Sequence, residues 1–139
     1  MNPFDFFDFM VCINLERRVD RWEESLIEFD KLGIYVTRFN AIESSDSSYG
    51  NHLSHASIIR FAKEKNLDNV LIFEDDIEFF PSARRNLINS IKDLPKDWDM
   101  FYLGANLDAY KAYRITPHLA KLTGAFSTHA YAIRHTLFD

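Results

Sequence analysis

Short apolar segments alternating with helical segments constrain the fold of this chain most. Four apolar segments rich in strand-forming residues cover positions 10–15, 34–39, 69–73 and 99–103. Apolar residues recur every three or four positions over residues 19–32 and 52–66, a spacing typical of amphipathic helices. A third helix is expected from Pro81-Ser82 to about Asp93, because proline suits a first turn and serine can cap it. The alternation predicts an α/β domain with a mostly parallel central sheet flanked by helices.

Glycine and polar residues mark the expected ends of these elements. Gly33 should stop the first helix, and Gly104 should end the fourth strand. Residues 44–50 and 106–117 are polar and are expected to form loops. Residues 123–133 predict one last strand or two short ones.

The length and composition fit one domain covering residues 1–139. The formal net charge of −5 argues against nucleic acid as a partner, which needs clustered basic residues. Cys12 is the only cysteine, so an intramolecular disulfide is impossible, and its apolar neighbours predict a buried thiol. Neither a signal peptide nor a membrane-spanning segment is recognisable in the sequence. We therefore expect a cytoplasmic protein with at most peripheral membrane association.

Three carboxylates in a row, Glu74-Asp75-Asp76, directly follow the third apolar strand and are named here the acidic turn. Adjacent ionised carboxylates repel one another, and Mg²⁺ or Mn²⁺ would relieve that repulsion by binding their oxygens together with substrate phosphates. Strand alternation places Glu74 and Asp76 on one side and Asp75 on the other. Glu74 and Asp76 could share one metal, or Asp76 could bind the metal while Asp75 holds a ribose. A solvated acidic turn is the alternative.

Four motifs occur in an order that resembles glycosyltransferase family 25, the lipooligosaccharide and procollagen galactosyltransferase group. They are the run 13–21 (INLERRVDR), the segment 39–42 (FNAI), Gly50 with Ser54-His55, and the strand and acidic turn 70–76 (VLIFEDD). Together they cover about residues 10–80, and residues 99–104 resemble the next strand of that family. The chain thus resembles a member of family 25, and a short or truncated one.

The resemblance implies a GT-A-like nucleotide-sugar-binding fold and a UDP-sugar donor. It also implies a divalent metal, Mn²⁺ or Mg²⁺, at the acidic turn and inversion at the anomeric carbon. The implied activity is transfer of a sugar, with galactose a frequent choice, to a lipooligosaccharide, polysaccharide or glycoprotein acceptor, as in lipopolysaccharide biosynthesis. The alternatives are a non-catalytic nucleotide-sugar-binding domain and another Mg²⁺ enzyme. Such a Mg²⁺ enzyme would often contain a glycine-rich phosphate-binding loop. Neither G-x-x-x-x-G-K-[ST] nor G-x-G-x-x-G occurs in this sequence.

Five residues outside the acidic turn are candidates for binding the nucleotide-sugar. The loop after the first strand commonly meets the nucleotide, which suggests Asn14, and Asp20 and Arg21 match the family motif. Arginine suits a diphosphate because its planar fork pairs with phosphate oxygens. Ser54 and His55 lie at an expected helix start, where free backbone N–H groups favour an anion. Glu74 and Asp75 complete the set.

The catalytic residues are the least constrained. His129, in the last predicted strand, could be an extra metal ligand or the general base that takes the proton of the acceptor hydroxyl. Asp99 and Asp108 are further candidates for that base.

Overall fold

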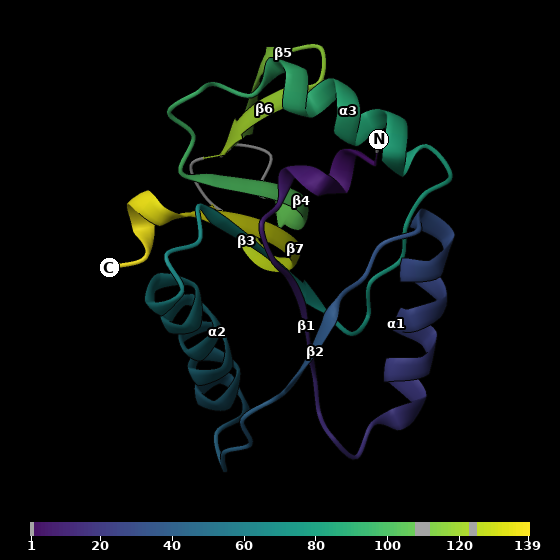
Figure 1. Cartoon of the computed structure of the whole chain (residues 1–139), viewed down its shortest axis with the longest axis vertical. Helices are drawn as coiled ribbons and strands as arrows, with labels where there is room; N and C mark the ends of the chain where they lie inside the picture. The colour runs from purple at the N-terminus through teal and green to yellow at the C-terminus, as the bar shows by residue number, and fades with distance from the viewer. Residues whose placement is uncertain (1, 108–111, 123–124) are drawn as a thin grey trace.

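A five-stranded mixed sheet forms the centre of the chain, as seen in a computed structural model that describes residues 2–107, 112–122 and 125–139 (Figure 1). The sheet order is β2 (Thr37–Asn40), β1 (Met10–Asn14), β3 (Asn69–Glu74), β7 (Ala125–Arg134) and β4 (Met100–Leu107). A separate hairpin joins β5 (Ala112–Thr116) and β6 (Leu119–Leu122). The helices are α1 (Val19–Leu32), α2 (Ser47–Glu64) and α3 (Ala83–Asp93), with short 3₁₀ helices η1 (Pro3–Phe6) and η3 (His135–Leu137).

The strands divide into a parallel half and an antiparallel half. β1 runs parallel to both β2 and β3, whereas β7 runs antiparallel to both β3 and β4. The predicted α/β class with flanking helices is therefore confirmed, but a mostly parallel sheet is not. The sheet is mixed because the last strand returns between β3 and β4 instead of extending the sheet at its edge.

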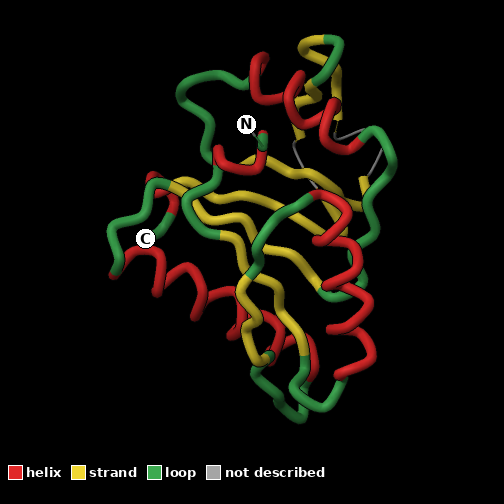
Figure 2. Tube along the Cα trace, turned by 45° about the vertical axis from the view of Figure 1, so that its right-hand side comes forward, coloured by secondary structure: helices red, strands yellow, loops and turns green. Residues whose placement is uncertain are grey.

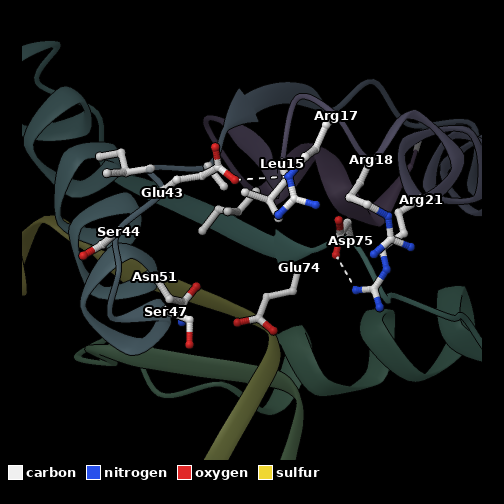
Figure 3. A pocket seen from close by; sticks show the side chains of 13 residues that line it. Leu15, Arg17, Arg18, Arg21, Glu43, Ser44, Ser47, Asn51, Glu74 and Asp75 are labelled. Atoms are coloured by element: carbon white, nitrogen blue, oxygen red, sulfur yellow. Dashed lines mark hydrogen bonds and ion pairs between the residues drawn. The ribbon is translucent and has the colours of Figure 1, made fainter.

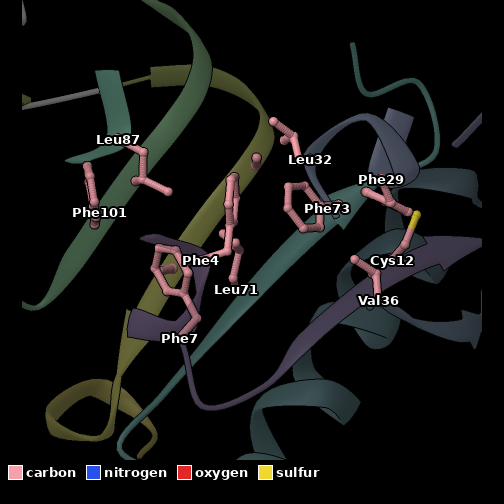
Figure 4. Packing of buried hydrophobic residues seen from close by; sticks show 12 residues of the cluster. Phe4, Phe7, Cys12, Phe29, Leu32, Val36, Leu71, Phe73, Leu87 and Phe101 are labelled. Carbon is pink, nitrogen blue, oxygen red and sulfur yellow. The ribbon is translucent and has the colours of Figure 1, made fainter. Parts of the chain in front are cut away.

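Each face of the sheet carries its own hydrophobic core, because strand side chains alternate between faces. Cys12, Leu71 and Phe73 point to the face covered by α1, α3 and η1, where the rings of Phe29 and Phe73 lie 5.2 Å apart (Figure 4). The other face is covered by α2. Its buried residues are Val11, Ile13, Ile58, Ala62, Val70, Ile72, Tyr131 and Ile133. Helices on both sides of the strands are visible in Figure 2.

Several element boundaries differ from the prediction. Helix α2 begins at Ser47 and not at residue 52, because the Asp46 side chain caps it by accepting from the backbone N–H groups of Ser48 and Tyr49. Gly104 does not end β4 but lies within it, at a register shift against β7. Residues 112–116 of the expected 106–117 loop form a strand. Helix α1 has the predicted bounds, and Gly33 ends it with a left-handed φ of 64°.

Candidate functional site

The parallel half of the sheet brings three strand ends to one edge. The carboxyl ends of β1, β2 and β3 are Asn14, Asn40 and Glu74, and the loop from β1 leads into α1 at the same edge. In open α/β sheets, ligands bind at such an edge. The acidic turn and the arginine-rich loop after β1 are therefore neighbours in space.

Glu74, Asp76 and His129 form a group with the chemistry of a cation site. Each offers one ligand atom, and these atoms all lie within 4.8 Å of one another; His129 Nδ1 is 3.4 Å from Asp76 Oδ2. The strand pairing brings His129 there, because its neighbour Ala130 lies opposite Phe73, the residue before Glu74. Two carboxylates and an imidazole suit a divalent cation such as Mn²⁺. This group of three is called the acid–histidine group below.

Asp75 points away from the acid–histidine group and is engaged elsewhere. Its Oδ2 accepts from Asn14 Nδ2 at 2.8 Å, and its Oδ1 accepts from Arg21 Nη1 at 3.3 Å. The backbone carbonyl of Asp75 also accepts from Ser25 Oγ, at 3.2 Å. Of the two arrangements left open by the sequence, the geometry favours Glu74 and Asp76 sharing a cation.

A pocket of about 290 Å³ opens beside the acidic turn (Figure 3). Its volume is close to the lower end of the range for small-molecule sites. Its lining residues are Ile13, Leu15, Arg17, Arg18, Arg21, Ala41, Ile42, Glu43, Ser44, Ser47, Asn51, Glu74 and Asp75. The arginines occupy one wall, while polar side chains from the start of α2 lie across from them. Glu74 belongs to both the pocket and the acid–histidine group.

Each arginine of the pocket pairs with a carboxylate. Arg17 Nε is 3.2 Å from Glu43, Arg18 Nη2 is 2.9 Å from Asp20, and Arg21 Nη1 is 3.3 Å from Asp75. The Arg17–Glu43 and Arg18–Asp20 pairs are exposed on both sides, and such pairs contribute little to stability. The Asp75 side chain is only 16% exposed, so the Arg21–Asp75 pair is better shielded from solvent.

Asp20 belongs to this arrangement indirectly. The two donors of Arg18 hold the pKa of the Asp20 carboxyl at about 2. Asp20 does not line the pocket and is exposed. The structure thus places Asp20 against a pocket arginine and not against the pocket itself.

His55 reaches the site from the middle of α2. Its Nδ1 lies 2.6 Å from the hydroxyl of Tyr131, and its Nε2 lies 3.7 Å from Glu74 Oε1. Burial raises the pKa of Tyr131 above its ordinary value. The imidazole of His55 thus lies between the Tyr131 hydroxyl and the Glu74 carboxylate. The expectation of a helix start at His55 is wrong, since α2 begins two turns earlier, at Ser47.

Ser54 has a structural position. Its fully buried hydroxyl accepts from the N–H of Ile42 at 2.8 Å and donates to the carbonyl of Gly50 at 3.0 Å. Gly50 packs so closely that a Cβ there would lie 2.5 Å from the Ile42 carbonyl oxygen. The two residues fasten α2 to the loop after β2, and the expected free N–H groups at Ser54 do not exist.

Asp99 lies at the end of the sheet opposite to the acidic turn, where β3 and β4 begin. It directly precedes β4, its side chain accepts from Thr136 Oγ1 at 2.7 Å, and its carbonyl accepts from the N–H of Arg134. Arg134 pairs with Asn69, at the amino end of β3. Asp99 is therefore not brought to the acidic turn. Asp108 lies outside the described residues.

From the sequence, Arg17, Arg18 or Arg21 could pair with a diphosphate, with a solvent-facing position favoured for Arg18; all three line the pocket. Two residues behind the site were not singled out by sequence reasoning. Tyr131 contacts His55, and Arg38 contacts Asn14. A charged residue inside the short strand β2 is the one signal in the sequence that could have drawn attention to Arg38.

Known proteins similar in sequence are named glycosyltransferase 25 family members or procollagen galactosyltransferases. A glycosyltransferase 25 family member from Anopheles gambiae is 30% identical over 122 residues, covering 66% of this chain and 21% of its own length. Procollagen galactosyltransferase 2 from Mus musculus is 24% identical over 162 residues, covering 91% and 26% respectively. The chain is therefore related in sequence to members of glycosyltransferase family 25. The resemblance found in its motifs is thereby confirmed.

Family 25 also includes a relative whose name states that it is inactive. Inactive glycosyltransferase 25 family member 3 from Homo sapiens is 29% identical over 127 residues, covering 84% of this chain and 21% of its own length. The chain thus spans about a fifth to a quarter of these relatives. The sequence matches no protein-family profile.

The membrane-spanning potential of the helices follows from their length and hydropathy. None of those in the described part of the chain has the combined length and hydropathy needed to cross a membrane.

Proposed function

We propose that this chain is the donor-binding part of a metal-dependent glycosyltransferase that uses a UDP-sugar. The observation that carries the proposal is the acid–histidine group next to an arginine-walled pocket, with Glu74 shared between them. A nucleotide diphosphate needs both kinds of partner, a divalent cation and fixed positive side chains. The family names of its relatives supply the reaction class.

Each part of the site then has a defined task. Arg17, Arg18 and Arg21 bind the diphosphate oxygens, and Glu74, Asp76 and His129 hold Mn²⁺ or Mg²⁺. When bound, the cation offsets the negative charge that develops on the departing diphosphate. We assign His129 to the cation and not to the proton of the acceptor, because its ring nitrogen lies against Asp76.

The GT-A-like fold, the inverting outcome and the acceptor are part of the same proposal. A three-stranded parallel half with a ligand edge supports the nucleotide-binding part of it. Relatives named procollagen galactosyltransferases, such as the one from Mus musculus, support galactose as the sugar and a glycoprotein as one class of acceptor.

A release assay tests the proposal. UDP release from a panel of UDP-sugars is measured with Mn²⁺ or EDTA, with and without an acceptor extract, on the wild-type chain and on Asp76→Asn. We expect Mn²⁺-dependent release that Asp76→Asn abolishes, while Asp97→Asn, an exposed acid far along the chain, behaves like wild type. Release unaffected by Asp76→Asn would sink the site assignment.

The second candidate is a nucleotide-sugar-binding domain without turnover. It is favoured by the human relative named as inactive and by the short span of family 25 that this chain covers. Mn²⁺-dependent binding of UDP with no release from any sugar, with or without acceptor, would favour this candidate over the enzyme.

A further inference from the structure

We infer that Arg38 is a positioning residue: from behind the pocket, through Asn14, it sets the arrangement of the arginines that bind the diphosphate. The inference rests on the proposed function, because it assigns a role in holding the same ligand. Arg38 itself does not line the pocket. It lies within β2, where its partner in the strand pairing is Cys12, in the middle of β1.

Arg38 fixes the side-chain amide of Asn14. Its Nε and Nη2 both donate to Asn14 Oδ1, at 2.9 and 2.6 Å. A guanidinium has no acceptor, so it can only face the oxygen of the amide, and the amide N–H₂ must point the other way. Asn14 is 1% exposed, which leaves it no water with which to exchange these contacts.

The fixed amide in turn holds two parts of the pocket. Asn14 Nδ2 donates to Asp75 Oδ2 at 2.8 Å and to the backbone carbonyl of Arg18 at 3.1 Å. Asp75 presents its other oxygen to Arg21. Through one amide group, Arg38 therefore influences both the carboxylate that orients Arg21 and the backbone that carries Arg18.

Arg38 also holds the loop after β1 directly. Its Nη2 donates to the carbonyl of Glu16 at 3.0 Å and lies 3.4 Å from that of Leu15. Its guanidinium lies over the Trp22 ring, 5.5 Å from the centroid, in the first turns of α1. Strand β2, the arginine loop and α1 are thus joined by one planar side chain whose several donors lysine cannot reproduce.

A purely structural role for Arg38 would predict a different outcome from a positioning role. Loss of a structural arginine lowers the melting temperature and leaves the ligand affinity of the folded protein unchanged. Loss of a positioning arginine weakens the binding of UDP through the arginine wall, whether or not metal is present. It leaves the affinity of the acid–histidine group for Mn²⁺ alone unchanged.

Calorimetric titration with UDP, in EDTA and in Mn²⁺, tests the inference, together with Mn²⁺ binding followed by electron paramagnetic resonance. We expect Arg38→Met to weaken UDP binding about tenfold in both conditions, the equivalent of one lost charge-assisted contact. Its Mn²⁺ affinity should equal that of wild type. Asn14→Asp keeps a partner for Arg38 but removes both amide donors, and should weaken UDP binding in the same way. Arg60→Met, at an exposed position of α2, is the control and should bind UDP as wild type does.

The possible outcomes separate the inference from the proposed function. Wild-type chain that binds no UDP overturns the proposed function. Wild-type chain that binds UDP, with a folded Arg38→Met that binds equally well, overturns the role of Arg38. If Arg38→Met does not fold, Arg38→Lys retains the charge without the fork. It is expected to bind UDP about tenfold more weakly, and wild-type affinity in that variant overturns the inference.

Discussion

The three adjacent carboxylates of the acidic turn are used in different ways. Glu74 and Asp76 approach His129, whereas Asp75 is occupied by Asn14 and Arg21. Mutual repulsion is therefore relieved in part by the protein itself, on the side of Asp75. Glu74 and Asp76, on the other side, are the two carboxylates left for the single cation of the proposed function.

Cys12 gives a prediction that depends on the core alone. The thiol is fully buried in β1, and burial raises its pKa to about 12, so almost no thiolate exists at neutral pH. We expect a thiol reagent such as Ellman's reagent to leave the native chain unmodified at pH 8 and to label one thiol per chain in denaturant. Rapid labelling of the native chain would show that β1 is not packed as described.

At the scale of elements, Glu28 connects α1 to the segment that follows the acidic turn. Its side chain is buried; Oε1 accepts from the N–H of Phe79 at 2.8 Å and Oε2 lies 2.5 Å from Lys31 Nζ. The hydrogen bonds from Lys31 and Phe79 lower the pKa of Glu28 from its ordinary value of 4.5. A lowered pKa means that the carboxylate stabilises the fold at pH above 4.5, and that this contribution is lost as the pH falls through the folded value.

Glu28→Ala should therefore lower the free energy of unfolding at pH 7 by about 1–3 kcal/mol, since it leaves the Phe79 N–H without its acceptor. The difference from wild type should shrink below pH 4.5. Urea unfolding at several pH values measures both effects. Glu24→Ala, exposed on the same helix, is the control. A difference that stays constant down to pH 3 would contradict the assigned role of the charge.

Gly50 gives a second prediction at the scale of elements, and the sign of the stability change on Gly50→Ala tests it. In an ordinary helix, Gly→Ala stabilises by about 1 kcal/mol. Here a Cβ would lie 2.5 Å from the Ile42 carbonyl oxygen and 3.2 Å from the Ser44 nitrogen, both of them backbone atoms. Gly50→Ala should instead destabilise the chain by about 1–3 kcal/mol, because α2 must move away from the loop after β2.

Thermal and urea unfolding measure this change. Ser48→Ala, exposed in the same turn of α2, should alter the stability by less than about 0.5 kcal/mol. A more stable Gly50→Ala variant would mean that α2 does not dock against Ile42 as described.

Elements that are specified by neighbouring residues in the sequence could be predicted. The bounds of α1 follow from its apolar spacing and from Gly33, and strand alternation placed Glu74 and Asp76 on one side. The first turn of α2 was missed because Ser47 and Ser48 are typical of loops, although Asp46 before them is a good cap.

Features set by long-range pairing could not be predicted. Whether His129 meets Asp76 depends on the register of β7 against β3, and no local pattern specifies that register. The same holds for Asp99, which the pairing places at the end of the sheet opposite to the acidic turn. The role of Arg38 could not be predicted because its partners, Asn14 and the loop after β1, lie more than twenty positions earlier in the sequence.

At the scale of the whole molecule, the shared position of Glu74 couples the two binding events. If the cation and the diphosphate occupy adjoining places, each should raise the affinity for the other by the same factor. We expect Mn²⁺ to increase the affinity for UDP, UDP to increase the affinity for Mn²⁺ equally, and the two together to raise the melting temperature by more than the sum of their separate effects.

Titrations of each ligand at fixed concentrations of the other measure the coupling. Asp76→Asn should abolish it while leaving UDP binding in EDTA intact, and Asp97→Asn should retain it. Independent, additive effects of the two ligands on the wild-type chain would place the cation away from the pocket.

The position of β7 in the middle of the sheet also affects how the chain is made. The ribosome produces β3 and β4 well before residues 125–134, yet the strand that pairs with both of them is β7. Until β7 is synthesised, the backbone N–H and C=O groups of β3 and β4 that pair with it have no partner. Such unpaired strands are sites at which nascent chains can associate wrongly. His129 is carried on that late strand, so the acid–histidine group comes into existence only when the sheet closes. A bound cation would therefore mark, in a newly made chain, that its central strand is in place.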